Sequence, residues 1–216
     1  MIDRFKLIIF DWDGTLMDSA LKIVTCFKQA AADTGAPYPG DESVRNVIGL
    51  GLTEAMKILF PSLDQTAKDA VVSRYREHFL YLDQTPMEFF PDVETGLVEL
   101  VDQGYTLAVA TGKARRGLDR IFERTHVGRL FSASRCADES RSKPHPQMLF
   151  DILKETGHDK DAAIMVGDTE YDLQMANEAG LVSLAVSYGV HERQRLLNHK
   201  PLACLDSFQS VCCWLT

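Results

Sequence analysis

Short apolar runs separated by helical patterns are the feature of this sequence that most restricts its fold. Strands are predicted at the apolar runs, which occupy residues 7–10, 105–111, 162–168, 181–186 and, more weakly, 203–205. Helical spacing of apolar residues is found between them, at residues 92–103, 146–156 and 170–178. Strands that alternate with helices are typical of a parallel sheet with helices on both faces. The sequence therefore predicts an α/β fold with a Rossmann-like sheet.

The connection after the first strand is too long for a simple crossover helix. It carries helical patterns at residues 20–33, 53–60 and 64–82. We therefore expect residues 17–87 to form an inserted, small helical cap domain. Residues 1–16 and 88–216 would form the α/β core domain.

The overall charge and the cysteines restrict the partners and the compartment. With 23 Lys and Arg against 31 Asp and Glu, the net charge is −8. Nucleic acids and anionic membranes attract basic surfaces, so neither is expected as a partner. We also expect no signal peptide and no membrane span, because no long apolar segment is present. The five cysteines are odd in number and show no CxxC spacing, which favours free thiols in the cytoplasm.

Polar residues stand at the ends of three predicted strands. Asp11, Thr111 and Asp168 each close an apolar run. The carboxyl ends of parallel strands meet at one edge of the sheet, where α/β proteins bind ligands. Asp13 follows Asp11 by two residues, so both side chains point the same way on an extended chain. Carboxylates in this arrangement suit Mg²⁺, and Asp168 could supply a third one.

The same edge carries groups suited to phosphoryl transfer. A carboxylate can attack phosphorus, and a second carboxylate can handle the proton of the leaving group. Thr111, Gly112 and Lys113 lie at a predicted strand-to-helix turn, where a hydroxyl and backbone N–H groups can meet an anion. Lys143 lies in a predicted loop and could supply positive charge. Phosphate-monoester hydrolysis is so slow without a catalyst that several such groups are needed together.

The four segments DWDGTLMDS, VATGK, SKPHP and GDTEYD occur in this order along the chain. In this respect the sequence resembles the haloacid dehalogenase superfamily of hydrolases, and most closely its phosphoglycolate-phosphatase-like branch. The resemblance implies a Mg²⁺-dependent phosphatase that acts on a small phosphomonoester through an aspartyl-phosphate. Dehalogenases of the superfamily lack the second aspartate and use no metal, so Asp13 favours phosphoryl transfer.

The resemblance also implies a role for each residue of the four segments. Asp11 would be the nucleophile, and Asp13 would be the general acid and then the base, with its backbone carbonyl on Mg²⁺. Thr111 would bind phosphoryl oxygens, and Lys143 would neutralise charge on the nucleophile and the phosphate. The remaining two acidic residues complete the predicted set. Asp168 would bind Mg²⁺, and Asp172 would support Lys143 or a metal-bound water.

Several interpretations remain open beside this one. A phosphomutase of the β-phosphoglucomutase type would share every core residue, and pyrophosphate is a possible substrate. A non-catalytic binding module would be favoured by loss of the acidic or lysine residues, all of which are present. A calcium loop of the EF-hand type is excluded, because its sixth position requires Gly and is Leu16 here.

Two further assignments concern residues beside or within the predicted cap. Arg45, in the segment VRNVIGLGL, is a candidate partner for a substrate carboxylate or phosphate, and it could equally be a surface arginine. Asp18 and Ser19 are predicted to cap the helix that follows them.

Overall fold

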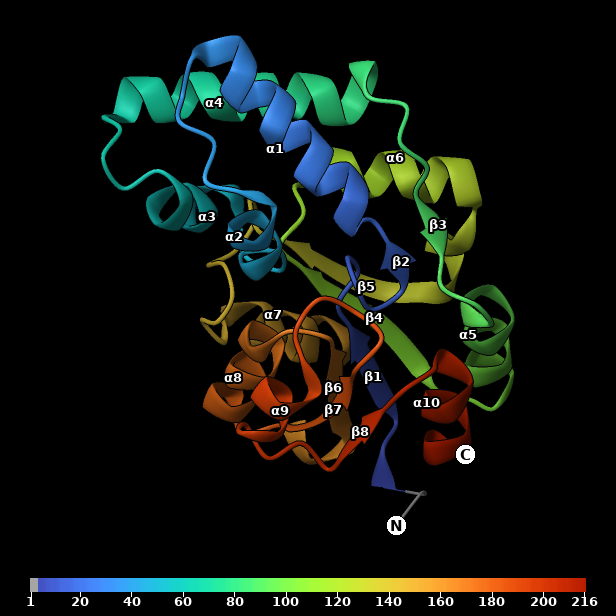
Figure 1. Ribbon diagram of the computed structural model, residues 1–216. Helices are drawn as coiled ribbons and strands as arrows, with labels where there is room; N and C mark the ends of the chain where they lie inside the picture. The colour runs from blue at the N-terminus through green and yellow to red at the C-terminus, as the bar shows by residue number, and fades with distance from the viewer. Residues whose placement is uncertain (1–3) are drawn as a thin grey trace.

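The computed structural model describes residues 4–216, and within them six strands form one sheet in the order β5–β4–β1–β6–β7–β8 (Figure 1). Each neighbouring pair is parallel. The strands are β1 (Leu7–Phe10), β4 (Thr106–Thr111), β5 (Phe131–Cys136), β6 (Ala163–Gly167), β7 (Val182–Val186) and β8 (Ala203–Leu205). The predicted α/β fold is confirmed.

Helices cover both faces of this sheet because the strands alternate their apolar side chains between two clusters. Ile8 and Phe10 belong to one cluster, and Leu7 and Ile9 belong to the other. The first cluster includes side chains of α5 (Val93–Asp102), α6 (Arg115–Thr125) and α10 (Phe208–Leu215). The second includes side chains of α7 (Gln147–Thr156) and α8 (Glu170–Ala179). A short helix, α9 (Arg193–Leu197), lies between β7 and β8 in the chain.

Strand β5 and helix α6 were not predicted from the sequence. β5 reads FSASRC, and only Ala133 and Cys136 of it are buried. It lies at an edge of the sheet, where half of its surface can stay polar, so it lacks a continuous apolar run. α6 reads RRGLDRIFERT, and its apolar residues Leu118, Ile121 and Phe122 stand at helical spacing among charged residues, so a local signal for this helix was present in the sequence.

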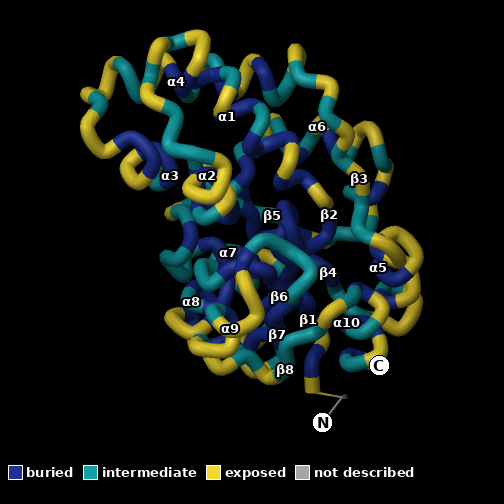
Figure 2. The backbone as a smooth tube through the Cα atoms, viewed as in Figure 1, coloured by how far each residue is buried: buried dark blue, intermediate teal, exposed yellow. Residues whose placement is uncertain are grey.

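The segment between β1 and β4 contains helices that pack on one another above the carboxyl edge of the sheet (Figure 1). They are α1 (Ala20–Thr34), α2 (Asp41–Asn46), α3 (Leu52–Leu59), α4 (Gln65–Glu77) and a π-helical segment, η2 (His78–Leu82). Their hydrophobic cluster is separate from those of the sheet, and the rings of Phe27 and Tyr75 lie 4.3 Å apart in it. We call this helical part the insertion. Its exposed residues lie on its helices and in the loops between them (Figure 2).

Two short strands mark where the chain leaves the sheet for the insertion and where it returns. β2 (Met17–Asp18) pairs in antiparallel fashion with β3 (Glu88–Phe89), so the two crossings lie side by side. The predicted domain limits at residues 17 and 87 stay a prediction. Within residues 4–216, no helix has the length and apolar character needed to cross a membrane.

Candidate active site

A buried ion pair forms the floor of the site. Asp11 follows β1 directly, and its side chain is wholly buried. Nζ of Lys143, which is also wholly buried, lies 2.6 Å from Oδ1 of Asp11 and 2.6 Å from Oδ1 of Asp172. One ammonium group therefore stands between two carboxylates out of contact with the solvent, where each charge depends on its partners.

The burial of these groups changes their acidity. Burial raises the pKa of Asp11 well above its ordinary value; Lys143 opposes this rise, while Asp172 and Asp168 add to it. Burial alone would lower the pKa of Lys143, but Asp11 and Asp172 outweigh it and raise that pKa to about 12. Lys143 is therefore charged at neutral pH. Burial, with the nearby Asp172 carboxylate, raises the pKa of Asp168 to about 7.

Asp168 is oriented by residues from two other segments. Oγ1 of Thr15 donates to its Oδ1 at 2.9 Å, and the backbone N–H of Val190 donates to its Oδ2 at 2.8 Å. Gly14 has φ +87°, and a Cβ there would lie 2.1 Å from Oδ2 of Asp168. A glycine is therefore required after Asp13, both for the turn and for the approach of Asp168.

Asp172 caps the start of α8 and also belongs to the buried ion pair. Its Oδ2 accepts the backbone N–H of Thr169 at 3.1 Å and the hydroxyl of Thr169 at 2.7 Å, as part of a capping box. Its Oδ1 faces Lys143. One side chain therefore caps the start of α8 and lies against Lys143.

Three of the acidic residues could hold a divalent cation. Asp11, Asp168 and Asp172 each offer a carboxylate oxygen, and these oxygens lie within 4.8 Å of one another. In the part of the chain that the structure describes, Oδ2 of Asp11 is buried and has no hydrogen-bond partner. Three carboxylates face one ammonium, and hard divalent cations prefer oxygen ligands. The donor set therefore fits Mg²⁺.

The carboxylate of Asp13 lies outside that group. Its Oδ1 accepts the hydroxyl of Ser19 at 2.6 Å and lies 2.9 Å from Nζ of Lys113. Ser19 stands at the N-terminus of α1, but its side chain makes no capping hydrogen bond, so the predicted capping role is wrong for that side chain. Nζ of Lys113 also lies 4.6 Å from the ring centre of Phe79 in the insertion, within cation–π distance.

The turn after β4 meets the insertion directly. Thr111 is wholly buried, and its Oγ1 accepts the backbone N–H of Lys113 at 3.2 Å. A Cβ at Gly112 would lie 2.4 Å from the carbonyl oxygen of Gly49 and 2.6 Å from that of Leu50. Only glycine therefore lets this segment of the insertion lie on the turn.

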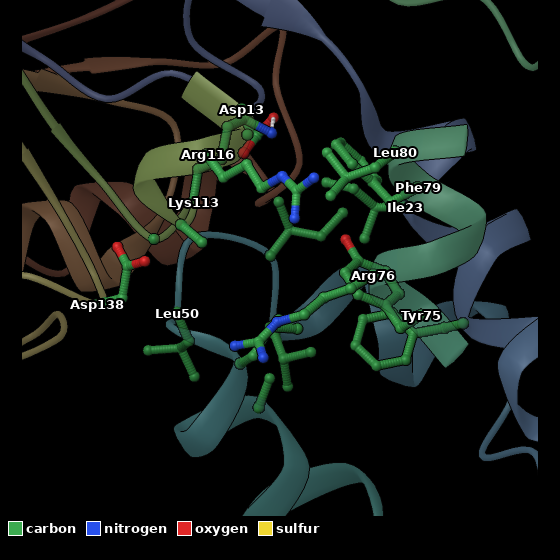
Figure 3. A pocket seen from close by; sticks show the side chains of 18 of the residues that line it. Asp13, Ile23, Leu50, Tyr75, Arg76, Phe79, Leu80, Lys113, Arg116 and Asp138 are labelled. Atoms are coloured by element: carbon green, nitrogen blue, oxygen red, sulfur yellow. Dashed lines mark ion pairs between the residues drawn. The ribbon is translucent and has the colours of Figure 1, made fainter. Parts of the chain in front are cut away.

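A cavity of about 490 Å³ opens between this edge of the sheet and the insertion (Figure 3). Asp13, Gly112 and Lys113 line it on the core side. Arg76 of α4 and Arg116 of α6 also line it, whereas Arg45 does not. The side chain of Arg45 is exposed on α2, whose buried residue is Val44, so the structure does not bring this candidate to the site.

Several residues of the site were not identified from the sequence. They are Thr15, the side chain of Lys113, Val190 and the two cavity arginines, Arg76 and Arg116. Thr15 lies in the segment DWDGTLMDS and Lys113 in the segment VATGK, so these two could have been identified by their position. No local pattern marks the other three.

This chain is similar to known proteins over most of its length. The sequence profile of the family described as "Haloacid dehalogenase-like hydrolase" matches residues 8–186. A protein of Dickeya dadantii named "Probable phosphatase IndB" is 36% identical over 209 residues, covering 95% of this chain and 91% of the relative. A protein of Aliivibrio fischeri named "Phosphoglycolate phosphatase" is 30% identical, covering 97% of this chain and 96% of the relative.

Solved structures show the same fold. A haloacid dehalogenase-like hydrolase from Bacteroides fragilis superposes with a TM-score of 0.89 at 22% identity, covering 96% of this chain and all of that chain (100%). A hydrolase from Pseudomonas syringae superposes with a TM-score of 0.87 at 18% identity, covering 98% of this chain and 97% of that chain.

Proposed function

This chain belongs to the haloacid dehalogenase-like hydrolase family, and from that premise we propose that it is a Mg²⁺-dependent phosphatase. The observation that carries the proposal is the state of the Asp11 carboxylate. One of its oxygens is held by Lys143, and the other is buried without a hydrogen-bond partner among residues 4–216. A carboxylate fixed at one end and free at the other is suited to act as a nucleophile.

In the first step, a carboxylate oxygen of Asp11 forms a bond to the phosphorus of the substrate. The bond between phosphorus and the ester oxygen breaks, and the leaving alkoxide takes a proton from Asp13. Asp13 suits this role because it lines the cavity in which the leaving group would lie. Lys143 and the Thr111 hydroxyl would stabilise the charge on the phosphoryl oxygens.

In the second step, water attacks the aspartyl-phosphate. Asp13, now a carboxylate, accepts a proton from the water as it adds to phosphorus. The bond between phosphorus and Asp11 breaks, which releases phosphate and restores the carboxylate. Lys143 stays charged throughout, because its pKa of about 12 lies far above neutral pH.

We assign Mg²⁺ to the carboxylates of Asp11 and Asp168 and to the backbone carbonyl of Asp13. When bound, Mg²⁺ supplies positive charge that offsets the charge of the phosphoryl group. Asp172 would support the site through Lys143. The grouping of their carboxylates supports this assignment for Asp11 and Asp168, and the carbonyl of Asp13 is assigned from the family resemblance.

The proposal extends to the class of phosphomonoesters and to a reducing compartment. Phosphoglycolate is the first compound to assay, because it is in the names of several relatives. Pyrophosphate belongs in the same panel. The five cysteines are free thiols, which supports the cytoplasm as the compartment.

The test is release of inorganic phosphate from a panel of phosphomonoesters and pyrophosphate, with Mg²⁺ and with a chelator. We expect release that needs Mg²⁺ and that falls by roughly 10³-fold or more in Asp11→Asn. Arg45→Gln, a change on the exposed side of α2, is the control and should release phosphate at the wild-type rate. Equal release by Asp11→Asn and wild type would refute the proposal. Transfer of phosphate to another hydroxyl of the substrate would identify a mutase instead.

A further inference from the structure

The cavity beside Asp13 is much larger than a small phosphorylated acid requires. Its volume is about 490 Å³, and pockets that enclose a drug-sized ligand measure about 300–1,000 Å³. The organic part of phosphoglycolate has two carbon atoms, so most of the cavity would hold water around it. The volume therefore suits a larger leaving group.

Apolar side chains of the insertion form most of the wall opposite the core. They include Ile23 and Phe27 of α1, Leu50 before α3, and Phe79 and Leu80 of η2. Figure 3 shows Ile23, Phe79 and Leu80 together on one side of the cavity. An apolar group that displaces water from such a wall gains free energy in proportion to the area it covers.

Two arginines enter the same cavity from opposite sides. Arg76 extends from α4 of the insertion and Arg116 from α6 of the core (Figure 3). Neither guanidinium forms an ion pair with a carboxylate of residues 4–216, and Arg116 donates only to the hydroxyl of Tyr81. Guanidinium groups bind carboxylates and phosphates through paired N–H donors. Both arginines thus have donors available for an anion.

The acidic residues around the cavity already have partners. Asp13 is paired with Lys113 at 2.9 Å, and Glu77 is paired with Arg74. Asp138 accepts a backbone N–H at 2.9 Å. An anionic ligand group would therefore meet free guanidinium donors and carboxylates whose charge is partly compensated.

We propose that the substrate is a phosphomonoester whose leaving group joins an apolar body of ring size to a second anionic group. The apolar body lies against the wall from α1 and η2, and the second anion binds Arg76 and Arg116. This inference rests on the proposed function, which places the phosphoryl group at Asp11. Because one arginine belongs to the insertion and the other to the core, the bound anion contacts both parts of the molecule.

The proposal is tested by binding, independently of turnover. Calorimetry in Mg²⁺ would compare three non-hydrolysable phosphonates: phosphonoacetate, benzylphosphonate and benzylphosphonate with a carboxylate on its ring. We expect the carboxylated aryl compound to bind at least about tenfold more tightly than either of the others. Equal or tighter binding of phosphonoacetate would overturn the proposal.

Variants assign the two parts of the ligand to the two parts of the cavity. Arg76→Gln should raise the Kd of the carboxylated aryl compound about tenfold and change the Kd of benzylphosphonate by no more than about twofold. Arg45→Gln, outside the cavity, should change neither. Leu80→Asn should weaken both aryl compounds and spare phosphonoacetate, and Ile58→Asn, on the exposed side of α3, is its control. Equal weakening of all three compounds by Arg76→Gln would also overturn the proposal.

The two proposals fail in different ways. Phosphate release without the binding preference would retain the phosphatase and overturn the inference about the leaving group. The binding preference without any phosphate release would support the ligand class and refute the phosphatase.

Discussion

The charged groups in the floor of the site are buried and paired, whereas the arginines of the cavity above it are exposed and have no ion-pair partner among the side chains that the structure describes. Asp11 and Lys143 have no exposed surface and lie 2.6 Å apart. Arg76 and Arg116 are exposed, and neither has an ion-pair partner among the described carboxylates. A buried charge without a partner is costly, whereas an exposed one keeps its water. The chemistry is therefore built into the fold, and the selection of substrate rests on groups that can change with little loss of stability.

Removing one charge from each region should give the largest contrast. Lys143→Met leaves Asp11 and Asp172 buried without their ammonium group, and we expect it to lower the free energy of unfolding by about 3–5 kcal/mol. Arg76→Met should change it by less than about 0.5 kcal/mol. Urea denaturation of both variants is the measurement, and similar losses in the two would contradict the contrast.

The dependence of stability on Mg²⁺ and pH should also come from the floor of the site and not from the cavity. The pKa of Asp168 is raised to about 7, so without metal the folded state binds more protons than the unfolded state between about pH 4 and pH 7. Its contribution to stability therefore falls as the pH rises through that window. Mg²⁺ needs the ionised carboxylate, so it should stabilise the protein more at pH 8 than at pH 6. At pH 8, Mg²⁺ at 100 times its Kd should add about 2.7 kcal/mol to the free energy of unfolding.

Thermal unfolding with Mg²⁺ and with a chelator measures this effect at both pH values. Asp168→Asn should remove most of it, and Arg76→Gln should retain it. A stabilisation by Mg²⁺ that is equal at pH 6 and pH 8 would argue against a site made of these carboxylates.

The contact between the core and the insertion, which closes the cavity over the floor, can be disturbed at Gly112. The Cβ of Gly112→Ala would lie 2.4 Å from the backbone of Gly49, and such overpacking costs about 1–3 kcal/mol. Protease cleavage within the insertion should become faster, and aryl phosphonates should bind more weakly. Gly35→Ala is the control, because its Cβ would meet nothing within 4 Å although its φ is +69°. That variant should lose some stability and keep its ligand affinity.

The smallest effect concerns a hydrogen bond on the other side of the same contact. The hydroxyl of Tyr171 in the core donates to the carbonyl oxygen of Asn46 in the insertion at 2.9 Å. Tyr171→Phe should cost about 0.5–1.5 kcal/mol and loosen the insertion. Tyr38→Phe removes a hydrogen bond to Asp41 within the insertion itself, and it should leave the protease sensitivity of the junction unchanged. Equal sensitivity in both variants would exclude a role for the Tyr171 hydroxyl in holding the two parts together.

Much of the fold could be predicted because burial of strands leaves a local pattern. The apolar runs at residues 7–10 and 203–205 became β1 and β8 with the same limits, and the other three runs agreed within one residue. The two failures differ in origin. β5 is an edge strand with polar residues and has no continuous apolar run, whereas α6 carries its three apolar residues at helical spacing and could have been predicted. Arg45 was singled out by its segment, but the face of α2 that carries it points to solvent.

The sequence by itself determined five of the six strands of the sheet, the edge at which polar residues gather, and the family. The strands depend on the period of apolar residues, and the family depends on four short segments that are all present in the chain. Only the tertiary structure decided which partner each charge has. Lys113 meets Asp13 through a contact between elements that are separate in the chain. Asp172, for which two roles were open, lies against Lys143. The same holds for Arg76 and Arg116, which enter one cavity because the insertion packs over the core. Such contacts depend on how whole helices pack, and a local pattern carries no information about that packing.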